Sequence, residues 1–207
     1  TLNCFMDLKY YWWSFPKALN DNLCDSIIEH SLNQKIEQGK TGQNFKKNNF
    51  KKRDSNIVWL KDEWIYKEIF PYINAANKNA EWNFHWSTSE SMQFTIYNKE
   101  QHYDWHQDAF PTYKNPSILD CYGLTRKLSV VCQLTDQKKY TGGELVFDTR
   151  DYSPEERDKK KHEQICSELK QRGTIVVFPS FVWHKVTPVK KGTRYSLVSW
   201  HLGHPFT

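Results

Sequence analysis

Four residues in the second half of the sequence carry the side chains needed for oxygen chemistry at a metal. His106 and Asp108 stand two positions apart in His-Gln-Asp, and His184 and Arg194 follow later in the chain. Two imidazoles and one carboxylate can occupy one face of an Fe(II) ion and leave its other positions open. An arginine nearby is suited to hold the carboxylate of an anionic cosubstrate. Together these residues predict a non-haem iron oxygenase.

The His-x-Asp pattern occurs twice, and its spacing does not choose between the two copies. His102-Tyr-Asp104 precedes His106-Gln-Asp108, and on a regular strand all four side chains would point to one face. Residues two apart on a strand are separated by about 6.6 Å, so either pair can converge on an ion with bonds of about 2.1 Å. Ala-Phe-Pro111 follows Asp108 and predicts a strand end, where sites at a barrel mouth usually lie. The alternative is a solvent-exposed polar strand face.

His184 and Arg194 also have simpler interpretations. His184 lies in the apolar run Phe181-Val-Trp-His-Lys-Val186, where a buried histidine often only bonds a backbone carbonyl. Arg194 can be read as an ordinary surface cation. The order and setting of the four residues together favour the metal site.

The composition indicates one folded domain that is rich in sheet. The chain has 207 residues, with nine Trp, eleven Tyr and twelve Phe, and aromatic residues favour strands. The net charge of +5 fits an acidic partner or solubility alone. No apolar run approaches about 18 residues, and the N-terminal residues lack a signal-peptide pattern, so we expect no membrane contact. Five cysteines without a C-x-x-C pair argue against a disulfide framework or a zinc knuckle and favour a reducing, cytoplasmic location.

Two amphipathic segments in the first part of the chain predict helices. Asn20-Asp21 can cap the first, whose apolar residues are Leu23, Ile27, Ile28 and Leu32. Asp62 opens the second, and Pro71 is expected to kink or break it; its apolar stripe is Ile65, Ile69, Ile73 and Ala76. The polar, Lys-rich stretch 39–54 is expected to be a mobile loop.

After Ala80 the pattern changes to short strand-like runs separated by glycines. The runs expected as strands are residues 82–88, 92–97, 103–107, 128–134, 144–147, 174–178, 182–186 and 194–202. Two helices followed by short strands predict a mainly β fold, a jelly-roll barrel with helical support. We expect one domain over residues 1–207, with support and first strands in about 1–90 and the barrel core in about 91–207. The charged segment 151–172 contains Ser153-Pro-Glu-Glu156, which has capping-box form, and predicts a surface helix or a disordered insert.

Four motifs, in this order, give the chain a resemblance to a known family. They are Tyr97-Asn-Lys-Glu-Gln-His-Tyr103-Asp-Trp-His106-Gln-Asp108, Arg126-Lys-Leu-Ser-Val-Val-Cys-Gln-Leu134, Gly142-Gly-Glu-Leu145, and Gly173-Thr-Ile-Val-Val-Phe-Pro-Ser180 through His184 to Arg194-Tyr-Ser-Leu-Val-Ser-Trp200. Over residues 91–201 the chain resembles the 2-oxoglutarate- and Fe(II)-dependent dioxygenases, and among them the prolyl 4-hydroxylase-like branch. The resemblance implies a double-stranded β-helix fold.

The resemblance also implies roles for particular residues. Family members carry a Tyr three positions before the first metal His, which Tyr103 provides for His106, so His106, Asp108 and His184 are expected to bind Fe(II). Arg194 matches the basic residue that holds the C5 carboxylate of 2-oxoglutarate. Further cosubstrate contacts are expected from Ser196, on the same strand face as Arg194, and from Tyr97 and Gln133.

Some positions depart from individual branches of that family. Collagen-type members have Lys at the Arg194 position, and oxygen-sensing members have Tyr at the Gln133 position. DNA-repair members have a second Arg where this chain has Trp200, which weighs against that branch. Phe178, Val186 and Trp200 are expected to wall the cavity, although each also fits an ordinary core position.

The branch implies that the substrate is a prolyl residue in a peptide or protein, with O2 as oxidant and ascorbate as reductant. Tyr103, Trp105 and Trp183 are expected to form an aromatic rim that receives an extended peptide. The basic run Lys46-Lys-Asn-Asn-Phe-Lys-Lys-Arg53 can contact an acidic partner or nucleic acid, act as a lid, or be a solvated loop. The alternatives are an oxygenase acting on a small molecule or nucleobase, and a catalytically silent metal- or carbohydrate-binding jelly roll. The presence of Arg194 beside the His/Asp/His set argues against the silent module.

Overall fold

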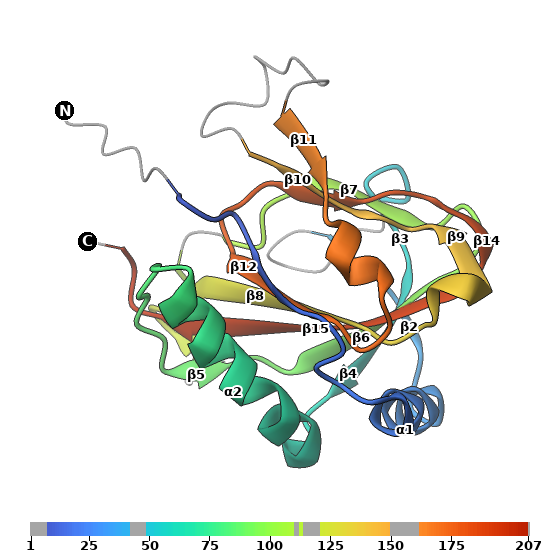
Figure 1. Cartoon of the computed structure of the whole chain (residues 1–207), viewed down its shortest axis with the longest axis horizontal. Coiled ribbons are helices and arrows are strands. Elements are labelled where there is room, and N and C mark those ends of the chain that lie inside the picture. Colours follow the sequence, from blue (N-terminus) through green and yellow to red (C-terminus); the bar gives the residue numbers. More distant parts are fainter. Residues whose placement is uncertain (1–7, 42–48, 110–111, 114–120, 150–161, 207) are drawn as a thin grey trace.

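The computed structural model shows two facing β-sheets, with two helices packed on the outer face of the larger one (Figure 1). It describes residues 8–41, 49–109, 112–113, 121–149 and 162–206. This arrangement confirms the prediction of a mainly β jelly roll supported by N-terminal helices. No helix in those ranges is long and apolar enough to cross a membrane.

The larger sheet has eight strands and forms one of the two walls of the jelly roll. Its order is β1-β12-β8-β15-β6-β4-β2, and β5 pairs with β15 beside this path. The strands are β1 (Trp13–Phe15), β2 (Glu37–Gln38), β4 (Asn56–Leu60), β5 (Thr88–Ser89), β6 (Met92–Tyr97), β8 (Thr125–Gln133), β12 (Ile175–Pro179) and β15 (Arg194–Gly203). Strands from the first 60 residues therefore extend a sheet whose centre comes from the second half of the chain.

The smaller sheet has five strands and covers the inner face of the larger one. Its order is β11-β10-β13-β7-β3, and a separate two-stranded sheet joins β14 to β9. The strands are β3 (Arg53–Asp54), β7 (His102–His106), β9 (Tyr140–Gly142), β10 (Leu145–Asp148), β11 (Glu163–Ile165), β13 (His184–Val186) and β14 (Val189–Gly192). The pairing of β13 with β7 is the contact that brings the two predicted metal histidines together.

Alternating side chains divide the apolar core into two layers. On β8, Leu128, Val130 and Cys132 face the helices, whereas Val131 faces the smaller sheet. The inner layer also contains Phe147 and Phe178, from opposite sheets, with ring centroids 4.9 Å apart. Successive strand residues point to opposite faces, so a central strand that is buried on both sides reads as a continuous apolar run.

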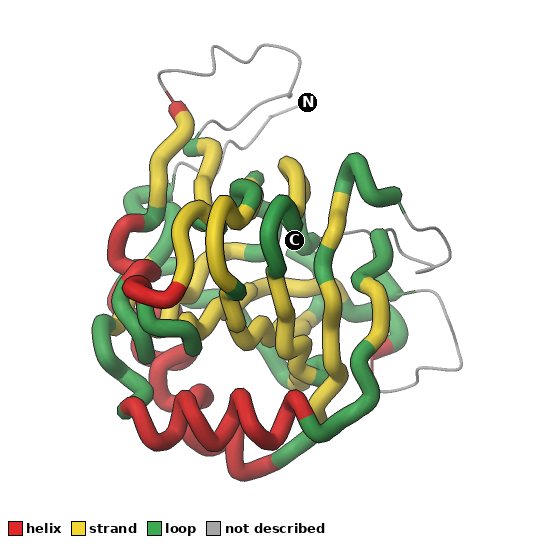
Figure 2. The backbone as a smooth tube through the Cα atoms, turned by 90° about the vertical axis from the view of Figure 1, so that its right-hand side faces the viewer, coloured by secondary structure: helices red, strands yellow, loops and turns green. Residues whose placement is uncertain are grey.

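The two predicted helices both form and lie along one side of the strands (Figure 2). The first, α1 (Asp21–Leu32), begins after Asn20, whose side chain accepts a hydrogen bond of 2.9 Å from the Leu23 amide. The second, α2 (Glu63–Asn79), continues through Pro71, so the predicted break does not occur. Its buried stripe of Ile65, Ile69, Ile73 and Ala76 packs on the sheet. Burying an isoleucine contributes about 2 kcal/mol, so this packing offsets the roughly 3 kcal/mol cost of the proline.

The expected strand at residues 82–88 is wrong for most of its length. Only Thr88–Ser89 pairs with β15, and the residues before it form a loop. The Asn77 side chain exchanges two hydrogen bonds with the Phe84 backbone, of 2.9 and 3.0 Å. Glu81 and Asn83 adopt positive φ angles of 60° and 52°, which no regular strand contains. Tertiary contacts thus override the aromatic, strand-like composition of this segment.

Two strands lie in segments for which the sequence predicts a mobile loop, at 39–54, and a surface helix or disordered insert, at 151–172. Arg53–Asp54 forms β3 at the edge of the smaller sheet, and Arg53 is buried rather than solvated. In the charged segment, β11 pairs with β10, and residues 167–170 form a short 3-10 helix. The basic residues Lys46 and Lys47, and the predicted capping box at 153–156, lie outside the described residues.

Candidate active site

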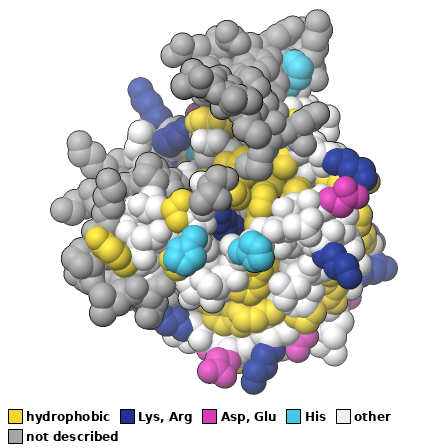
Figure 3. Space-filling view, turned by 90° about the vertical axis from the view of Figure 1, so that its left-hand side faces the viewer, with side chains coloured by type: hydrophobic (Ala, Val, Ile, Leu, Met, Phe, Trp, Pro, Cys, Tyr) yellow, Lys and Arg dark blue, Asp and Glu magenta, His cyan; other side chains and the backbone are white. Residues whose placement is uncertain are grey.

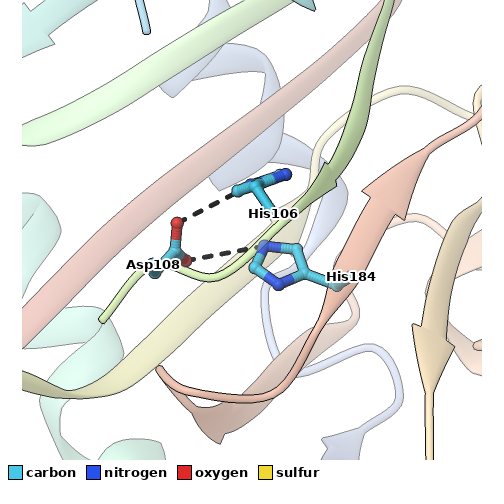
Figure 4. Close-up of side chains that lie close together, drawn as sticks. All are labelled: His106, Asp108 and His184. Carbon is cyan, nitrogen blue, oxygen red and sulfur yellow. Dashed lines mark ion pairs between the residues drawn. The ribbon is translucent and has the colours of Figure 1, made fainter. Parts of the chain in front are cut away.

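Three potential metal ligands converge between the two sheets, just beyond the end of β7. His106 and His184 are register partners on β7 and β13, with ring centroids 4.1 Å apart. Asp108 Oδ1 lies 3.7 Å from His106 Nε2, and its Oδ2 lies 3.6 Å from His184 Nε2 (Figure 4). One ligand atom from each residue lies within 4.8 Å of the others. Such a set fits around a single ion with bonds of about 2.1 Å.

Both histidine rings are oriented in the same way by the backbone. Nδ1 of His106 lies 2.8 Å from the carbonyl oxygen of Asp104, and Nδ1 of His184 lies 2.9 Å from that of Val182. A carbonyl only accepts, so Nδ1 carries the proton and donates, which leaves the Nε2 lone pair free for a metal. The sequence supplies this orientation by placing each histidine two residues after the carbonyl it contacts.

The segment that carries Asp108 is tied to the segment that precedes His184. The backbone amides of Asp108 and Ala109 donate to the Ser180 carbonyl at 2.9 and 2.8 Å. The Gln107 side chain donates to the carbonyl of Phe181. These bonds hold the carboxylate in register with the second histidine, so the site is largely formed before any ligand binds.

The electrostatics of the site favour the metal-binding protonation states. Burial, and then the neighbouring His184, hold the pKa of His106 well below its ordinary value of 6.5, so the ring is neutral at neutral pH. Burial alone would raise the pKa of Asp108, but His184, His106, Arg126 and the Trp200 indole lower it to about 2. A neutral imidazole and an ionised carboxylate are the forms that ligate Fe(II).

An irregularity in β7 separates the two His-x-Asp pairs, contrary to the expectation that all four side chains share one face. His184 pairs with His106 while Val186 pairs with Tyr103, so β7 has one residue more than β13 between these points. Tyr103 therefore stacks on His106, with centroids 3.5 Å apart. His102 instead contacts the carbonyl oxygens of Lys51 and Glu100, at 3.2 Å each.

Arg194 is a buried cation at the start of β15, with one group left for a ligand. Its side chain is 1% exposed, its Nε donates to Gln133 Oε1 at 3.0 Å, and its Nη1 lies 3.4 Å from Ser196 Oγ. Its Nη2 has no hydrogen-bond partner among the described residues. Tyr97 lies opposite in register, its ring centre 5.8 Å from the guanidinium carbon. A buried guanidinium N–H without an acceptor fits the carboxylate of a bound anion.

The three predicted rim residues differ in placement. Tyr103 lies at the site, and burial raises the pKa of its hydroxyl to about 12. Trp183 is half-buried in the turn before β13. Trp105 lies under Lys185, whose Nζ is 4.3 Å from its ring centre. Because Lys185 alternates with His184 along β13, this is the outer face of the sheet, and the prediction that Trp105 lies on the rim is wrong.

Aromatic side chains wall the site, among them Phe178, which the sequence predicts there, and Phe147, which it does not. The Phe178 ring centre lies 4.7 Å from that of His184, and Phe147 lies 6.2 Å from it. Seen from the left of Figure 1, the surface is hollowed, with basic atoms inside the hollow and histidine and hydrophobic side chains around it (Figure 3). An apolar wall with a few polar groups is the usual character of a ligand site.

The sequence analysis assigns no role at the site to four residues that lie near it: Arg53, Trp59, Glu90 and Arg126. Arg126 binds Glu90 through Nε and Nη2, at 2.6 Å each, and stacks on Trp200 with its guanidinium carbon 3.9 Å from the ring centre. Trp59 lies 6.3 Å from Trp200. Arg53 stacks on Tyr103 at 4.7 Å, and its Nη2 has no partner in the described part of the chain. Only Arg126, inside a quoted motif, carries a local signal; the others are placed by tertiary structure.

Comparison with known proteins decides the family. Residues 92–202, which contain all three ligands and Arg194, match the family model of the 2OG-Fe(II) oxygenase superfamily. The chain belongs to the 2OG-Fe(II) oxygenase superfamily. Members of this superfamily use Fe(2+), 2-oxoglutarate and O2. The buried donor set and the unpartnered Arg194 N–H fit an iron ion and a dicarboxylate, respectively.

Among curated relatives, this 2OG-Fe(II) oxygenase is similar to PKHD-type hydroxylases. It is 34% identical over 107 residues to one from Alteromonas mediterranea, a match that covers 52% of this chain and 41% of the relative. It is 28% identical over 130 residues to one from Crocosphaera subtropica, covering 62% and 50%. The chain thus spans about half the length of the curated relatives it matches.

Solved structures share the oxygenase fold along nearly the whole chain. A Pseudomonas putida prolyl-4-hydroxylase superposes with a TM-score of 0.67 at 17% identity, covering 95% of each chain. A viral collagen prolyl hydroxylase from Paramecium Bursaria Chlorella virus-1 gives 0.62 at 17% identity, covering 96% and 99%. A Trichoplax adhaerens prolyl hydroxylase in complex with a hypoxia inducible factor peptide gives 0.62 at 15% identity, covering 93% and 84%.

Proposed function

We propose that this chain is an Fe(II)- and 2-oxoglutarate-dependent dioxygenase that hydroxylates a prolyl residue in a peptide or protein. The observation that carries the proposal is the pairing of a buried His106–Asp108–His184 set with a buried Arg194 whose Nη2 has no partner among the described residues. A protein that only bound metal would not need the second feature.

The protein's own contribution is binding and orientation. His106, Asp108 and His184 would hold the iron through Nε2, a carboxylate oxygen and Nε2, and the site already favours the neutral His106 and the ionised Asp108. Iron, when bound, supplies the redox chemistry by which O2, 2-oxoglutarate and a C–H bond give CO2, succinate and a C–OH group. The walls of Phe147 and Phe178 exclude water from the reacting atoms.

The cosubstrate would be anchored by Arg194 and its neighbours. Arg194 directs Nη2 to the far carboxylate of 2-oxoglutarate, and the Ser196 hydroxyl and the Tyr97 hydroxyl add donors beside it. Gln133 serves the arginine: its Oε1 accepts from Arg194 Nε and its Nε2 donates to the Thr135 carbonyl at 2.8 Å. Gln133 therefore orients the guanidinium group of Arg194, and Arg194 binds the carboxylate of 2-oxoglutarate.

A peptidyl substrate is supported by the mouth of the site and by the relatives. Trp59, which is partly exposed, and the neighbouring Trp200 offer aromatic surface beside Tyr103 on which a pyrrolidine ring can stack. The free N–H of Arg53 suits a backbone carbonyl of an extended peptide. The similar structures are prolyl hydroxylases, one of them in complex with a peptide. Ascorbate is proposed as the reductant that keeps the iron ferrous.

A nucleobase substrate has weaker support. The described end of the basic run turns inward: Lys52 donates to the Trp105 carbonyl, and Arg53 is buried against Tyr103. Neither side chain then contributes to an exposed basic surface of the kind that contacts the phosphates of a nucleic acid. No observation on the described residues favours the small-molecule alternative.

Parallel assays with two substrate classes test the proposal. The enzyme is incubated with Fe(II), 2-oxoglutarate and ascorbate, and offered proline-containing peptides or single-stranded oligonucleotides. We expect succinate release coupled to the gain of one oxygen atom on proline, and neither product from His106→Ala. Oxidised or demethylated bases with untouched peptides would overturn the prolyl assignment, and absence of succinate with every substrate would overturn the enzyme assignment.

A further inference from the structure

Trp200 is a buried tryptophan whose indole N–H has no clear acceptor in the part of the chain that the structure describes. The residue is 6% exposed, and its Nε1 has no partner among the described residues. A buried donor without an acceptor destabilises the fold. Such a group is expected to meet an acceptor when the site is in its working state.

The plane of the Trp200 ring is fixed from one side by a buried ion pair. The Arg126 guanidinium carbon lies 3.9 Å from the ring centre, and Glu90 accepts from Arg126 Nε and Nη2 at 2.6 Å each. The two charged side chains are only 7% and 13% exposed. A two-bond fork locks the guanidinium plane, so the indole beneath it has little freedom to turn.

The carboxylate of Asp108, in the metal centre, is a candidate acceptor for the Trp200 indole N–H. Trp200 pairs in register with Ser129, whose hydroxyl lies 2.9 Å from that of Ser180. The Ser180 carbonyl accepts from the backbone amide of Asp108 at 2.9 Å. Through Ser129 and Ser180, the backbone of Asp108 therefore lies close to the position of Trp200 on β15. The same proximity makes the indole one of the groups, after His184, His106 and Arg126, that lower the pKa of Asp108 against the opposing effect of burial.

The Asp108 carboxylate needs a donor once it binds metal. Its Oδ1 lies 3.7 Å from His106 Nε2, and its Oδ2 lies 3.6 Å from His184 Nε2. When one oxygen becomes a ligand, the other keeps its lone pairs in a buried site. Groups that bond the free oxygen of a ligating carboxylate typically strengthen metal binding by about 10–100-fold.

We propose that Trp200 is a positioning residue for the metal centre. Its indole N–H holds the Asp108 oxygen that does not bind the metal, and the Arg126–Glu90 pair holds the indole. This inference rests on the proposed function, because it takes Asp108 as an iron ligand.

The competing account treats Trp200 only as an aromatic wall for the substrate. Trp200→Phe separates the two, because phenylalanine keeps a ring under Arg126 and loses the N–H. Cobalt(II) is the probe, titrated into metal-free protein without 2-oxoglutarate or peptide, with affinity and visible spectrum as readouts. The matched control is Trp64→Phe, which alters a half-exposed tryptophan on α2 that packs against His30, 5.8 Å away.

We expect Trp200→Phe to weaken cobalt binding by about ten-fold or more and to change the cobalt spectrum, and Trp64→Phe to do neither. Arg126→Lys gives a second test if the first variant folds poorly: it keeps the charge but loses the fork, and weakened cobalt binding is expected again. Unchanged cobalt affinity and spectrum in Trp200→Phe, with a raised KM for peptide, would overturn the inference and leave the proposed function intact. Failure of the parent protein to bind cobalt would instead overturn the proposed function, and the inference with it.

Discussion

His106 and His184 face each other across the β7–β13 pair, with ring centres 4.1 Å apart. Each ring is held by the carbonyl two residues before it, so the two Nε2 atoms are presented to a common point. The equivalence arises from backbone geometry on two paired strands. The carboxylate of Asp108 closes the third side of the same point.

Removal of one ligand tests which His-x-Asp pair binds metal. His106→Ala should abolish tight binding of one iron per chain, because two protein ligands remain and the buried Asp108 loses a neighbour. His102→Ala should keep the iron, since the hydrogen bonds of His102 to described residues go to the carbonyls of Lys51 and Glu100 and not to the metal site. Metal content after desalting measures both. Loss of iron in His102→Ala with retention in His106→Ala would show that the wrong pair is assigned.

Arg194→Ala tests the cosubstrate anchor. A carboxylate left unpaired in a buried site costs about 2–5 kcal/mol, and each 1.4 kcal/mol is tenfold in affinity. We expect the 2-oxoglutarate Kd to rise by roughly thirty-fold or more, with iron content unchanged. Arg194→Lys, which keeps the charge without the fork, should fall between. Calorimetric titration of the metal-loaded protein measures each Kd, and an unaltered Kd in Arg194→Ala would contradict the assignment.

Gly143 lies against the side chain of Arg194, and Gly123 offers a matched control for its substitution. Its φ is +62°, and an added Cβ would lie 3.0 Å from Arg194 Cδ and 3.0 Å from Val189. Gly143→Ala should therefore cost stability and also weaken 2-oxoglutarate binding. Gly123→Ala carries similar backbone strain, with φ +76°, but meets nothing within 4 Å. It should lose about 1–2 kcal/mol of stability and no cosubstrate affinity. Equal 2-oxoglutarate affinities in the two variants would contradict the prediction that a side chain at position 143 displaces Arg194.

His201 should make folding stability depend on pH. Its nitrogens lie 2.8 Å from Ser89 Oγ and 3.1 Å from Ser199 Oγ, and burial lowers its pKa to about 3 from 6.5. The unfolded chain therefore binds a proton that the folded chain refuses, so the free energy of unfolding falls as pH drops below about 6.5 and continues to fall toward pH 3.

Between about pH 7 and about pH 5 this one histidine should remove about 2 kcal/mol of stability. His201→Gln, which keeps a polar side chain without a titrating ring, should lack that part of the loss. Urea unfolding at the two pH values measures it, with His102→Gln as the control on the other sheet. The same decrease in His201→Gln and in the parent protein would rule out this origin.

The sequence predicts the chemistry-bearing residues better than their surroundings. His106, Asp108, His184 and Arg194 follow from the order of motifs, and the structure places the first three together. The choice between the two His-x-Asp pairs came from resemblance, because strand alternation makes them equivalent. The structure separates them through the extra residue in β7, an irregularity that depends on pairing with β13 and has no local signal.

Residues that reach the site from distant segments could not be predicted. Glu90 meets Arg126 only because β6 and β8 both flank β15, and Trp59 arrives on β4 from the other end of the sheet. Arg53 sits in a run of lysines that reads as solvated, yet pairing of β3 with β7 buries it. Burial cannot be predicted from local composition where a short edge strand forms only by pairing with a distant strand.

The most direct test of the central claim is the fate of the two atoms of dioxygen. The enzyme, loaded with Fe(II), is supplied with 2-oxoglutarate, a proline peptide and isotopically labelled O2 in unlabelled water, and both products are measured by mass spectrometry. The account predicts one labelled oxygen in succinate and one in hydroxyproline, in equal amounts. Label in succinate alone would mean that proline is not the substrate, and label in neither product would contradict dioxygenase chemistry in this site.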